Sequence, residues 1–334
     1  MSLNAFLTRG TSGRMAAGRV VALGASKDPN AKLVLVEVGP DGARQAVKLA
    51  TTPVAAEALE AERGALLQMR TRCAGDPALL ATLPEPLSIR VWNGSPALVC
   101  TAVPGASLAT AYHRRGHTAR PAQVAEDLRL AGGWLARFHL ATAAPEATTV
   151  CFGRDVLARL EARFDGDARL DRVRGSLADA AYQLASARVA RTASHGDFWC
   201  GNVLVSDGRV SGVVDWECAT GEGEPLRDLA RFALAYALYL DRHTRGGREV
   251  RGHSGLRAGA PCGGLDYAIA GSGWFPELFA EFLGEGLARC GADRDLWRAL
   301  ALVGVADVAG SADSPAFAGD HLDCLTRLVE GAAP

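Results

Sequence analysis

Residues 194–217 read SHGDFWCGNVLVSDGRVSGVVDWE, and their acidic and amide side chains lie at the ends of two apolar, strand-like runs. The segment SDGR separates these runs, and Asp-Gly is a preferred dipeptide for a two-residue hairpin turn. We therefore assign a turn role to Asp207 and predict that the stretch folds as strand, turn and strand. A carboxylate at the edge of a hydrophobic strand is costly unless a cation or a hydrogen-bond donor compensates it.

The register of this hairpin predicts which side chains meet. A two-residue turn pairs Val205 with Val210, so that Asn202 faces Val213 and Asp215 lies one diagonal step further along. Diagonal neighbours are roughly 7–8 Å apart at the backbone, which lets two side chains converge on one cation. Carboxylate and carboxamide oxygens are hard ligands that suit Mg²⁺. The hairpin therefore predicts a magnesium site.

Asp197 precedes Asn202 by five residues, in a loop flanked by glycines, where it could accept a proton from a nucleophile. The whole pattern is H-G-D-x-x-x-x-N, followed thirteen residues later by an Asp that closes an apolar strand. It resembles the catalytic and metal-binding loops of the aminoglycoside phosphotransferase and choline-kinase family, small-molecule kinases with a protein-kinase-like fold. The resemblance implies that Asp197 is the catalytic base and that Asn202 and Asp215 bind the Mg²⁺ of ATP.

Two further residues take roles from the same resemblance. His195 could be a metal ligand by residue type, but the family resemblance implies a structural role. The segment GEPLRDLARF resembles the family's sequence after the second metal-binding Asp. There, Asp228 would brace the catalytic loop through hydrogen bonds without touching substrate.

Lys48 lies in QAVKLA, an otherwise apolar strand, and two readings are open for it. A lone Lys in such a place commonly reaches solvent from a sheet edge. The resemblance implies instead that Lys48 binds the α- and β-phosphates of the nucleotide and is held by a Glu of the next helix. In ERGALLQM we choose Glu62 for that role, with Glu60 as the second choice.

The segment ALVCTAVPGASL resembles the connector between the lobes of these kinases. The resemblance implies that the adenine edge meets the carbonyl of Thr101 and the N–H of Val103, with Cys100 beside the base; an ordinary strand and turn is the alternative. No G-x-G-x-x-G lies between the first strands, so the part of Ser26 or Lys27 in phosphate binding stays open. A Walker G-x-x-x-x-G-K-[ST] is also absent, which argues against a P-loop kinase.

The expected fold is α+β, a protein-kinase-like bilobal fold. Residues 1–103 form an N-lobe with a small antiparallel sheet and one helix, and residues 104–334 form a mainly helical C-lobe. Gly- and Arg-rich residues 244–264 show no periodicity and are interpreted as a mobile loop. Helices are expected at about residues 54–70, 123–142, 167–192 and 226–240, and from about 274 onward.

The composition limits the classes of molecule that the chain is expected to bind. The chain has 334 residues, 49% hydrophobic and 22% charged, with a net charge of −1, so neither nucleic acid nor an anionic membrane is expected as a partner. No apolar run approaches the roughly 18–20 residues that cross a bilayer, and the first 20 residues lack a signal-peptide core. We therefore expect a cytoplasmic monomer or homodimer. The eight scattered cysteines form no C-x-x-C and are expected to be buried or half-buried thiols.

The expected activity is ATP-dependent phosphorylation of a hydroxyl on a small molecule, with GTP as a possible donor. No A-P-E-like segment follows Asp215, which argues against protein substrates. The expected substrate loop, residues 242–257, carries five arginines. They argue against polycationic aminoglycosides and favour a neutral or weakly charged antibiotic such as a nucleoside or macrolide, although the arginines could instead simply solubilise the loop. A kinase of a sugar, choline-like compound or amino alcohol is the alternative. A metal-dependent hydrolase using His195, Asp197 and Asp215, and a silent nucleotide-binding module, are rival classes.

Overall fold

The computed structural model describes residues 19–25, 30–39 and 42–331. The chain divides into two compact units. The first unit is Met1–Ser107 with His195–Asp197 and Asn202–Gly221, and the second is Leu108–Ser194 with Phe198–Gly201 and Glu222–Pro334. The predicted boundary between lobes at residue 103 stays a prediction. The first unit therefore combines the N-terminal residues with two segments that are distant from them in sequence.

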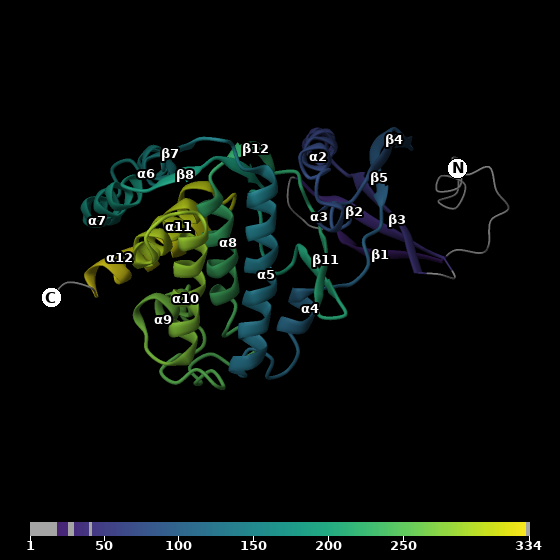
Figure 1. Ribbon diagram of the computed structural model, residues 1–334. Helices are drawn as coiled ribbons and strands as arrows, with labels where there is room; N and C mark the ends of the chain where they lie inside the picture. Colours follow the sequence, from purple (N-terminus) through teal and green to yellow (C-terminus); the bar gives the residue numbers. More distant parts are fainter. Residues whose placement is uncertain (1–18, 26–29, 40–41, 332–334) are drawn as a thin grey trace. The chain divides into compact units, whose positions relative to one another are not determined.

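Five antiparallel strands form the main sheet of the first unit, in the order β1-β2-β3-β5-β4 (Figure 1). Asn93 and Gly94 connect β4 to β5 with φ values of 50° and 83°, the paired positive values of a type I′ turn. The residues that join β2 to β3, and Ser26 and Lys27 after β1, lie outside the described residues. The strands are β1 Arg19–Ala25, β2 Lys32–Gly39, β3 Gly42–Ala50, β4 Pro86–Trp92 and β5 Ser95–Thr101.

The pleat of β3 decides where Lys48 points. Val47 and Leu49 belong to the hydrophobic cluster on one face of the sheet, so Lys48 between them points to the other face. Helix α2 (Pro53–Arg72) packs on β3 and β5 and contributes the carboxylate that Lys48 contacts. Because β3 pairs with strands on both sides, Lys48 does not lie at a sheet edge, and the reading in which it extends to solvent is wrong.

Strands β10 (Val203–Ser206) and β11 (Arg209–Val213) form the predicted hairpin, and β6 (Ala106–Ser107) pairs with β10. The turn residues Asp207 and Gly208 have φ values of 52° and 69°, as a type I′ turn requires. The predicted hairpin and its turn are therefore confirmed.

The predicted register is confirmed only near the turn. Val205 pairs with Val210 as expected, but a β-bulge then shifts the pairing so that Val213 faces Val203 and not Asn202. Ser211 is the extra residue of the bulge, and its hydroxyl donates to the Pro104 carbonyl at 2.6 Å. This hydrogen bond gives Ser211 a partner outside the strand pairing. A register that is counted outward from the turn assumes one-to-one pairing, so it misses this extra residue.

The second unit is built mainly of helices (Figure 1). Its long central helix α5 contacts α8 and α10, and α11 contacts α6, α7, α8 and α12. The helices are α4 Leu108–Tyr112, α5 Pro121–Thr142, α6 Phe152–Arg163, α7 Ala168–Ala185, α8 Pro225–Leu238, α9 Gly263–Ala270, α10 Trp274–Arg289, the 3-10 helix η1 Arg294–Leu296, α11 Trp297–Ser311 and α12 Pro315–Glu330; α3 Pro77–Leu80 belongs to the first unit.

The helix expected over residues 167–192 ends earlier than predicted. Helix α7 stops at Ala185, and the chain continues as β8 (Arg188–Ala190) and β9 (Thr192–Ser194). Val189, which lies inside the helix expected at residues 167–192, is in β8 and pairs with Thr148 of β7 (Ala147–Thr149). Both partners are β-branched, and cross-strand packing favours such residues in a strand.

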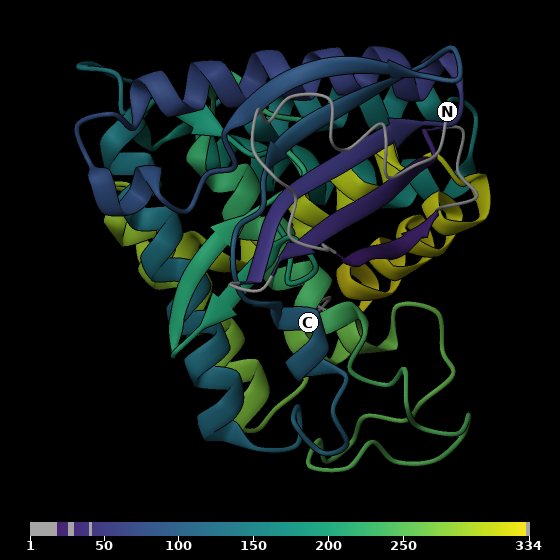
Figure 2. The ribbon, with the colours of Figure 1, turned by 90° about the vertical axis from the view of Figure 1, so that its right-hand side faces the viewer.

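Residues 244–262 contain no helix and only one isolated β-bridge, between Glu249 and Arg257, and can be followed as the long green trace in Figure 2, whereas residues 263–264 of the expected loop begin α9. The segment is nevertheless held internally: the Val250 N–H donates to Leu256 O at 2.8 Å and the Ala258 N–H donates to Arg248 O at 2.9 Å. His253 is fully buried and donates to Thr118 O at 2.8 Å. These contacts do not support the interpretation of a wholly mobile loop.

The described helices also answer the membrane question. None of them is long and apolar enough to span a bilayer.

Of the eight cysteines, Cys218 is exposed, although all eight were expected to be buried or half-buried. The other seven are buried or half-buried free thiols.

Candidate active site

The Lys48 ammonium lies between two carboxylates in the first unit. Its Nζ is 2.6 and 2.8 Å from the two oxygens of Glu62 and 2.7 Å from Asp215 Oδ1. Burial favours the neutral amine, but the charges of Glu62 and Asp215 outweigh burial and raise the pKa of Lys48. The structure thus joins Lys48 and its expected partner Glu62 with Asp215, the expected metal ligand, and Lys48 carries its positive charge at this point.

Helix α2 presents Glu62 to this cluster. The helix begins at Pro53, where Thr52 Oγ1 accepts a hydrogen bond from the Ala55 N–H at 3.0 Å, which is a typical helix cap. Glu62 is 2% exposed, whereas Glu60 is exposed, so the choice between these two residues follows from the helix face. The Trp216 N–H also donates to Glu62 Oε1 at 3.3 Å.

Asp215 follows the end of β11 with a backbone φ of 70°. This left-handed conformation is uncommon for a residue other than Gly and is found disproportionately at functional sites. Burial opposes ionisation of Asp215, but Lys48 and, more weakly, Lys32 lower its pKa. Asp215 is therefore a carboxylate that the surrounding lysines hold in its charged form.

Asp197, His195 and Asn202 form a hydrogen-bonded group. Asn202 Nδ2 donates to the Asp197 carbonyl at 2.9 Å and to Asp197 Oδ2 at 3.2 Å. Because the amide nitrogen faces Asp197, the amide oxygen is the atom that remains for a cation. The Val214 N–H donates to Asn202 O at 3.0 Å, so the residue next to Asp215 is the direct neighbour of Asn202. This contact follows from the bulge and brings the two predicted metal ligands to adjacent backbone positions.

His195 connects the Asp197 loop to the segment after β11 that carries Asp215. Its Nδ1 accepts from the Asp197 N–H at 3.3 Å, and its Nε2–H donates to Val214 O at 3.0 Å. The ring is fully buried and lies 4.6 Å from the Trp216 ring, centroid to centroid. With both ring nitrogens bonded to backbone groups, His195 has no lone pair for a metal, and this geometry favours the structural reading.

Glu217 and Lys32 belong to the site but were not selected from the sequence. Lys32 contacts Glu217 in an ion pair whose side chains are 8% and 18% exposed, and Asn30 Nδ2 donates to Glu217 Oε1 at 2.8 Å. Burial and the nearby Asp215 raise the pKa of Glu217 although Lys32 opposes them. A signal was present: Glu217 stands two residues after Asp215, and Lys32 is one of only three lysines.

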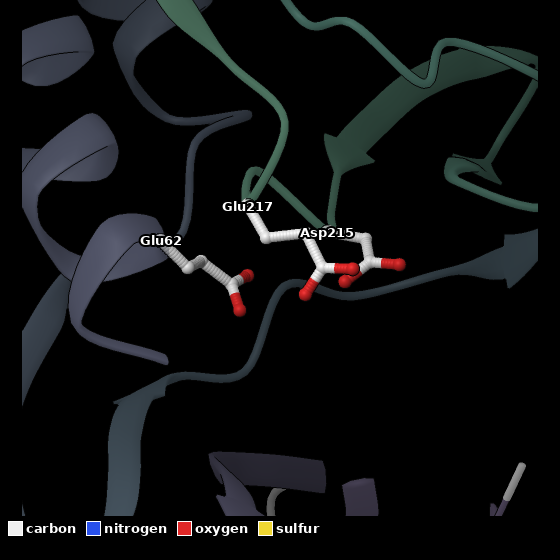
Figure 3. Close-up of side chains that lie close together, drawn as sticks. All are labelled: Glu62, Asp215 and Glu217. Atoms are coloured by element: carbon white, nitrogen blue, oxygen red, sulfur yellow. The ribbon is translucent and has the colours of Figure 1, made fainter. Parts of the chain in front are cut away.

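Three carboxylates of the first unit converge on one point. Oxygens of Glu62, Asp215 and Glu217 all lie within 4.8 Å of one another, and Figure 3 shows the three groups turned toward each other. Hard anionic oxygens in this number fit Mg²⁺, which also retains waters and phosphate oxygens in its shell. Glu62 holds Lys48 with both of its oxygens, and Glu217 uses its two oxygens for Asn30 and Lys32. Asp215 contacts Lys48 through Oδ1, so Asp215 and the Asn202 amide are the first candidates for a divalent cation, and Glu217 could join them only by releasing Lys32 or Asn30.

The connector residues lie where β5 ends. Cys100 is buried in β5, and burial raises the pKa of its thiol to about 12. Thr101 is the last residue of the strand, and the Ala102 N–H donates to Arg44 O at 3.1 Å. Within the described part of the chain, the Val103 N–H makes no hydrogen bond, so it is free to meet a ligand.

Asp228 lies in the first turn of α8 and is fully buried. This burial agrees with a structural residue. Its expected hydrogen bonds to the catalytic loop stay a prediction.

The chain resembles known proteins in sequence and in fold. A sequence model of the phosphotransferase enzyme family matches residues 30–262. No curated protein sequence matches the chain.

Solved structures resemble the chain over nearly its whole length. A ternary complex of a thermostable mutant of aminoglycoside phosphotransferase APH(4)-Ia with AMP-PNP and hygromycin B is 15% identical, with 100% of both chains covered and a TM-score of 0.55. A Ralstonia eutropha protein described as an aminoglycoside phosphotransferase is also 15% identical, covering 98% of this chain and 95% of that one, with a TM-score of 0.53. At such identities the likeness concerns the fold, and it confirms the expected kinase-like α+β class.

Proposed function

Because the chain belongs to the phosphotransferase enzyme family, we propose that it transfers the γ-phosphoryl group of ATP, or of GTP, to a hydroxyl of a small molecule. One observation carries the proposal: the Lys48 ammonium bridges Glu62 and Asp215, 2.6 and 2.7 Å away. A cation held by two carboxylates is positioned to bind the phosphates of a nucleotide. One of the two carboxylates, that of Asp215, would then bind the metal ion. Family membership already makes the chain a phosphotransferase enzyme, so the hydrolase reading is dropped.

The nucleotide would be held at both ends. Lys48 would bind its α- and β-phosphates, with Glu62 fixing the lysine. The backbone carbonyl of Thr101 and the free N–H of Val103 would meet the edge of the base, and Cys100 would border its plane. Residues 1–103 would then act as the nucleotide-binding N-lobe, and residues 104–334 would carry the catalytic loop and the acceptor site.

Asn202 and Asp215 would hold Mg²⁺, and Glu217 would add a third oxygen donor to this set on releasing Lys32 or Asn30. When bound, Mg²⁺ supplies positive charge that offsets the phosphate oxygens. The chain's own residues would position the reacting groups. His195 connects the Asp197 loop to the segment that carries Asp215. This connection would keep the groups that bind the acceptor at a fixed distance from those that bind the nucleotide.

Asp197 would act as the catalytic base that orients the acceptor hydroxyl and accepts its proton. Its Oδ2 accepts a hydrogen bond from Asn202 Nδ2 at 3.2 Å, which holds the carboxylate in one orientation. General-base catalysis of this kind contributes typically 10²–10⁴-fold in rate.

The acceptor would be a neutral or weakly charged hydroxylated molecule. An antibiotic such as a nucleoside or macrolide fits the near-neutral chain, with its net charge of −1, better than a polycationic aminoglycoside does. Five arginines also lie near or within residues 244–262 and would repel polycations. They are Arg242, Arg245, Arg248, Arg251 and Arg257. A sugar, a choline-like compound or an amino alcohol is the alternative acceptor, and we propose that the protein acts in the cytoplasm.

Incubation with ATP, Mg²⁺ and a panel of antibiotics and metabolic alcohols tests the proposal, with mass spectrometry reporting the added phosphate. Asp197→Asn should keep nucleotide binding, measured by calorimetry, and lose at least a hundredfold in turnover. A fully active Asp197→Asn variant would exclude Asp197 as the base. Nucleotide binding without transfer to any acceptor, in the unmodified protein, would favour the silent binding module.

A further inference from the structure

Two cysteines of the second unit meet at the point where α9 begins. Cys262 is the residue before α9, and Cys324 lies on α12. A hydrogen bond joins their two side chains, so the sulfur atoms are direct neighbours. Cys262 is 7% exposed and Cys324 is fully buried. Both residues belong to the second unit, so their contact does not depend on how the two units are arranged.

The surroundings of Cys262 favour its thiolate. His321 Nδ1 carries a proton, because it donates to Phe317 O at 2.8 Å, and this nitrogen lies 3.8 Å from Cys262 Sγ. The hydrogen bond with Cys324 lowers the pKa of Cys262, burial opposes this effect, and the hydrogen bond with His321 lowers the pKa further. The result is a pKa well below the usual value for a thiol. A thiolate is the reactive form of cysteine.

Cys324 keeps its proton. Its thiol donates to Asp266 Oδ1 at 3.3 Å, and the contact with Cys262, burial and the charge of Asp266 raise the pKa of Cys324. Asp266 is in turn held by Arg327 Nε at 2.9 Å, and Arg327 Nη2 donates to Pro261 O at 3.0 Å, next to Cys262. A thiolate and a thiol are therefore in contact, as in the pairing of a reactive cysteine with a resolving cysteine.

Local structure does not require a cysteine at position 262. The backbone φ of Cys262 is 58°, a left-handed conformation that favours Gly or Asn over other residues and is found disproportionately at functional sites. The Cys262 side chain makes no capping hydrogen bond to α9. Its sulfur is therefore not needed to begin the helix, and the positive end of the helix dipole adds to the stability of a thiolate there.

A metal site is the other common use of neighbouring cysteine and histidine side chains. In the part of the chain that the structure describes, one set of three or more potential ligands lies within 4.8 Å of one another, and it is the three-carboxylate group of the first unit. The ligand atoms of Cys262, His321 and Cys324 are more widely spaced than that. The cluster therefore favours thiol oxidation over metal binding.

We propose that Cys262 and Cys324 form a reversible disulfide when the protein is exposed to a peroxide. The Cys262 thiolate attacks one oxygen of hydrogen peroxide, the O–O bond breaks, and hydroxide leaves and takes up the proton that Cys262 released on ionisation. Cys262 is then a sulfenic acid. The Cys324 sulfur attacks the Cys262 sulfur, the S–O bond breaks, and water leaves with the Cys324 proton. The two thiols lose two electrons, which reduce the peroxide to two waters.

This disulfide would attach the end of residues 244–262 to α12. Its formation needs neither nucleotide nor acceptor, because both cysteines lie outside the residues proposed for phosphoryl transfer. A disulfide that closes a long loop restricts the unfolded chain and so stabilises the folded one. We therefore expect oxidation to raise the midpoint of thermal unfolding.

Peroxide treatment of the unmodified, full-length protein is the direct test. The remaining thiols are blocked with iodoacetamide, and the protein is digested without reductant and examined by mass spectrometry. We expect a disulfide-linked peptide pair with Cys262 and Cys324 to form before the exposed Cys218 is oxidised. The pair and the rise in the unfolding midpoint should both disappear with dithiothreitol. Oxidation of Cys218 without any linked pair would overturn the proposal.

Three variants separate the roles of the two cysteines. Cys324→Ser removes the resolving thiol, so the sulfenic acid of Cys262 should persist and be trapped by dimedone. Cys262→Ser should leave Cys324 reduced. Cys290→Ser is the control, because Cys290 is a half-buried thiol of the same unit whose pKa burial raises to about 11, and it should form the linked pair as the unmodified protein does.

Oxidation of Cys324 in Cys262→Ser at the rate of the unmodified protein would refute Cys262 as the reactive thiol. Absence of a dimedone adduct on Cys262 in Cys324→Ser would refute the sulfenic acid step. Circular dichroism establishes that each variant is folded, and the linked peptide pair from the unmodified protein decides the proposal without any variant.

Discussion

The Lys48 ammonium contacts both carboxylate oxygens of Glu62, at 2.6 and 2.8 Å, in a pair whose side chains are 16% and 3% exposed. Asp215 is a second anion for the same cation. Breaking a buried ion pair by removing one charge is costly because the remaining charge has lost both solvent and partner. The pair therefore links the proposed nucleotide binding to the stability of the first unit.

Glu62→Gln should lower both stability and nucleotide affinity. Asp215 remains as a partner for Lys48, so we expect a loss of about 2–3 kcal/mol in the free energy of unfolding, below the full cost of an isolated buried charge. Urea denaturation measures the stability, and calorimetry with Mg²⁺ and ATP measures the affinity. Glu60→Gln, on the exposed face of α2, should change neither; an equal effect of the two variants would contradict the assignment of Glu62.

Glu217→Gln should weaken divalent-cation binding. Glu217 lies with Asp215 in the group of three carboxylates, and loss of one anionic donor typically lowers the affinity of a hard cation. We expect about a tenfold increase in the dissociation constant of Mn²⁺, used as a paramagnetic substitute for Mg²⁺ and followed by electron paramagnetic resonance. Glu222→Gln is the control because Glu222 is exposed. An unchanged Mn²⁺ affinity would restrict Glu217 to its ion pair with Lys32.

Gly105→Ala should destabilise the protein far more than Gly208→Ala. Gly105 has a φ of 113°, and an added Cβ would lie 2.8 Å from the Val205 carbonyl oxygen, which cannot move away easily. Gly208 has a φ of 69° with nothing within 4 Å of the added Cβ, so only the left-handed backbone opposes Ala there, at about 1–2 kcal/mol. We expect at least a further 1–2 kcal/mol for Gly105→Ala in urea denaturation. Equal losses would mean that the contact with β10 relaxes.

His139 should make stability fall as the solution becomes acidic. Burial lowers its pKa from 6.5 to about 4 in the folded protein, so between these values the unfolded chain binds a proton that the folded chain does not. Stability therefore rises with pH through this window and is lost as pH falls toward 4. From pH 7 to pH 5 this one group should cost about 2 kcal/mol in the free energy of unfolding. His139→Gln should show a correspondingly flatter pH profile in urea denaturation; parallel profiles would contradict a neutral, buried His139.

The stretch of residues 194–217 predicted a large part of the fold because its signals are local. Asp207-Gly208 specifies a turn by backbone conformation alone, and the structure has that turn. The bulge at Ser211 was missed because its cause is the Pro104 carbonyl, more than a hundred residues away in the chain. The strand after Ala185 was missed for the same reason, since Val189 finds its partner on β7.

The residues of the candidate site also divide into those that the sequence identified and those that it did not. Glu62 was identified because ERGALLQM resembles the Glu-containing helix of the family, and the structure buries Glu62 while Glu60 is exposed. Glu217 and Lys32 were not identified, because their importance lies in a contact between β2 and the residues after β11, which no periodicity encodes. Lysine is rare in this chain, and that rarity was the only local hint of the role of Lys32.

The first compact unit is discontinuous, since residues 202–221 complete what residues 1–107 begin. During synthesis the ribosome delivers the chain from its N-terminus, so Lys48 and Glu62 emerge long before Asp215 does. The first unit cannot complete its fold until residue 221 of 334 has left the exit tunnel. Until then, Lys48 has only one of its two carboxylate partners. An isolated N-terminal fragment ending near residue 107 would be arrested at the same stage, and it is therefore a poor surrogate for the nucleotide site of the whole chain.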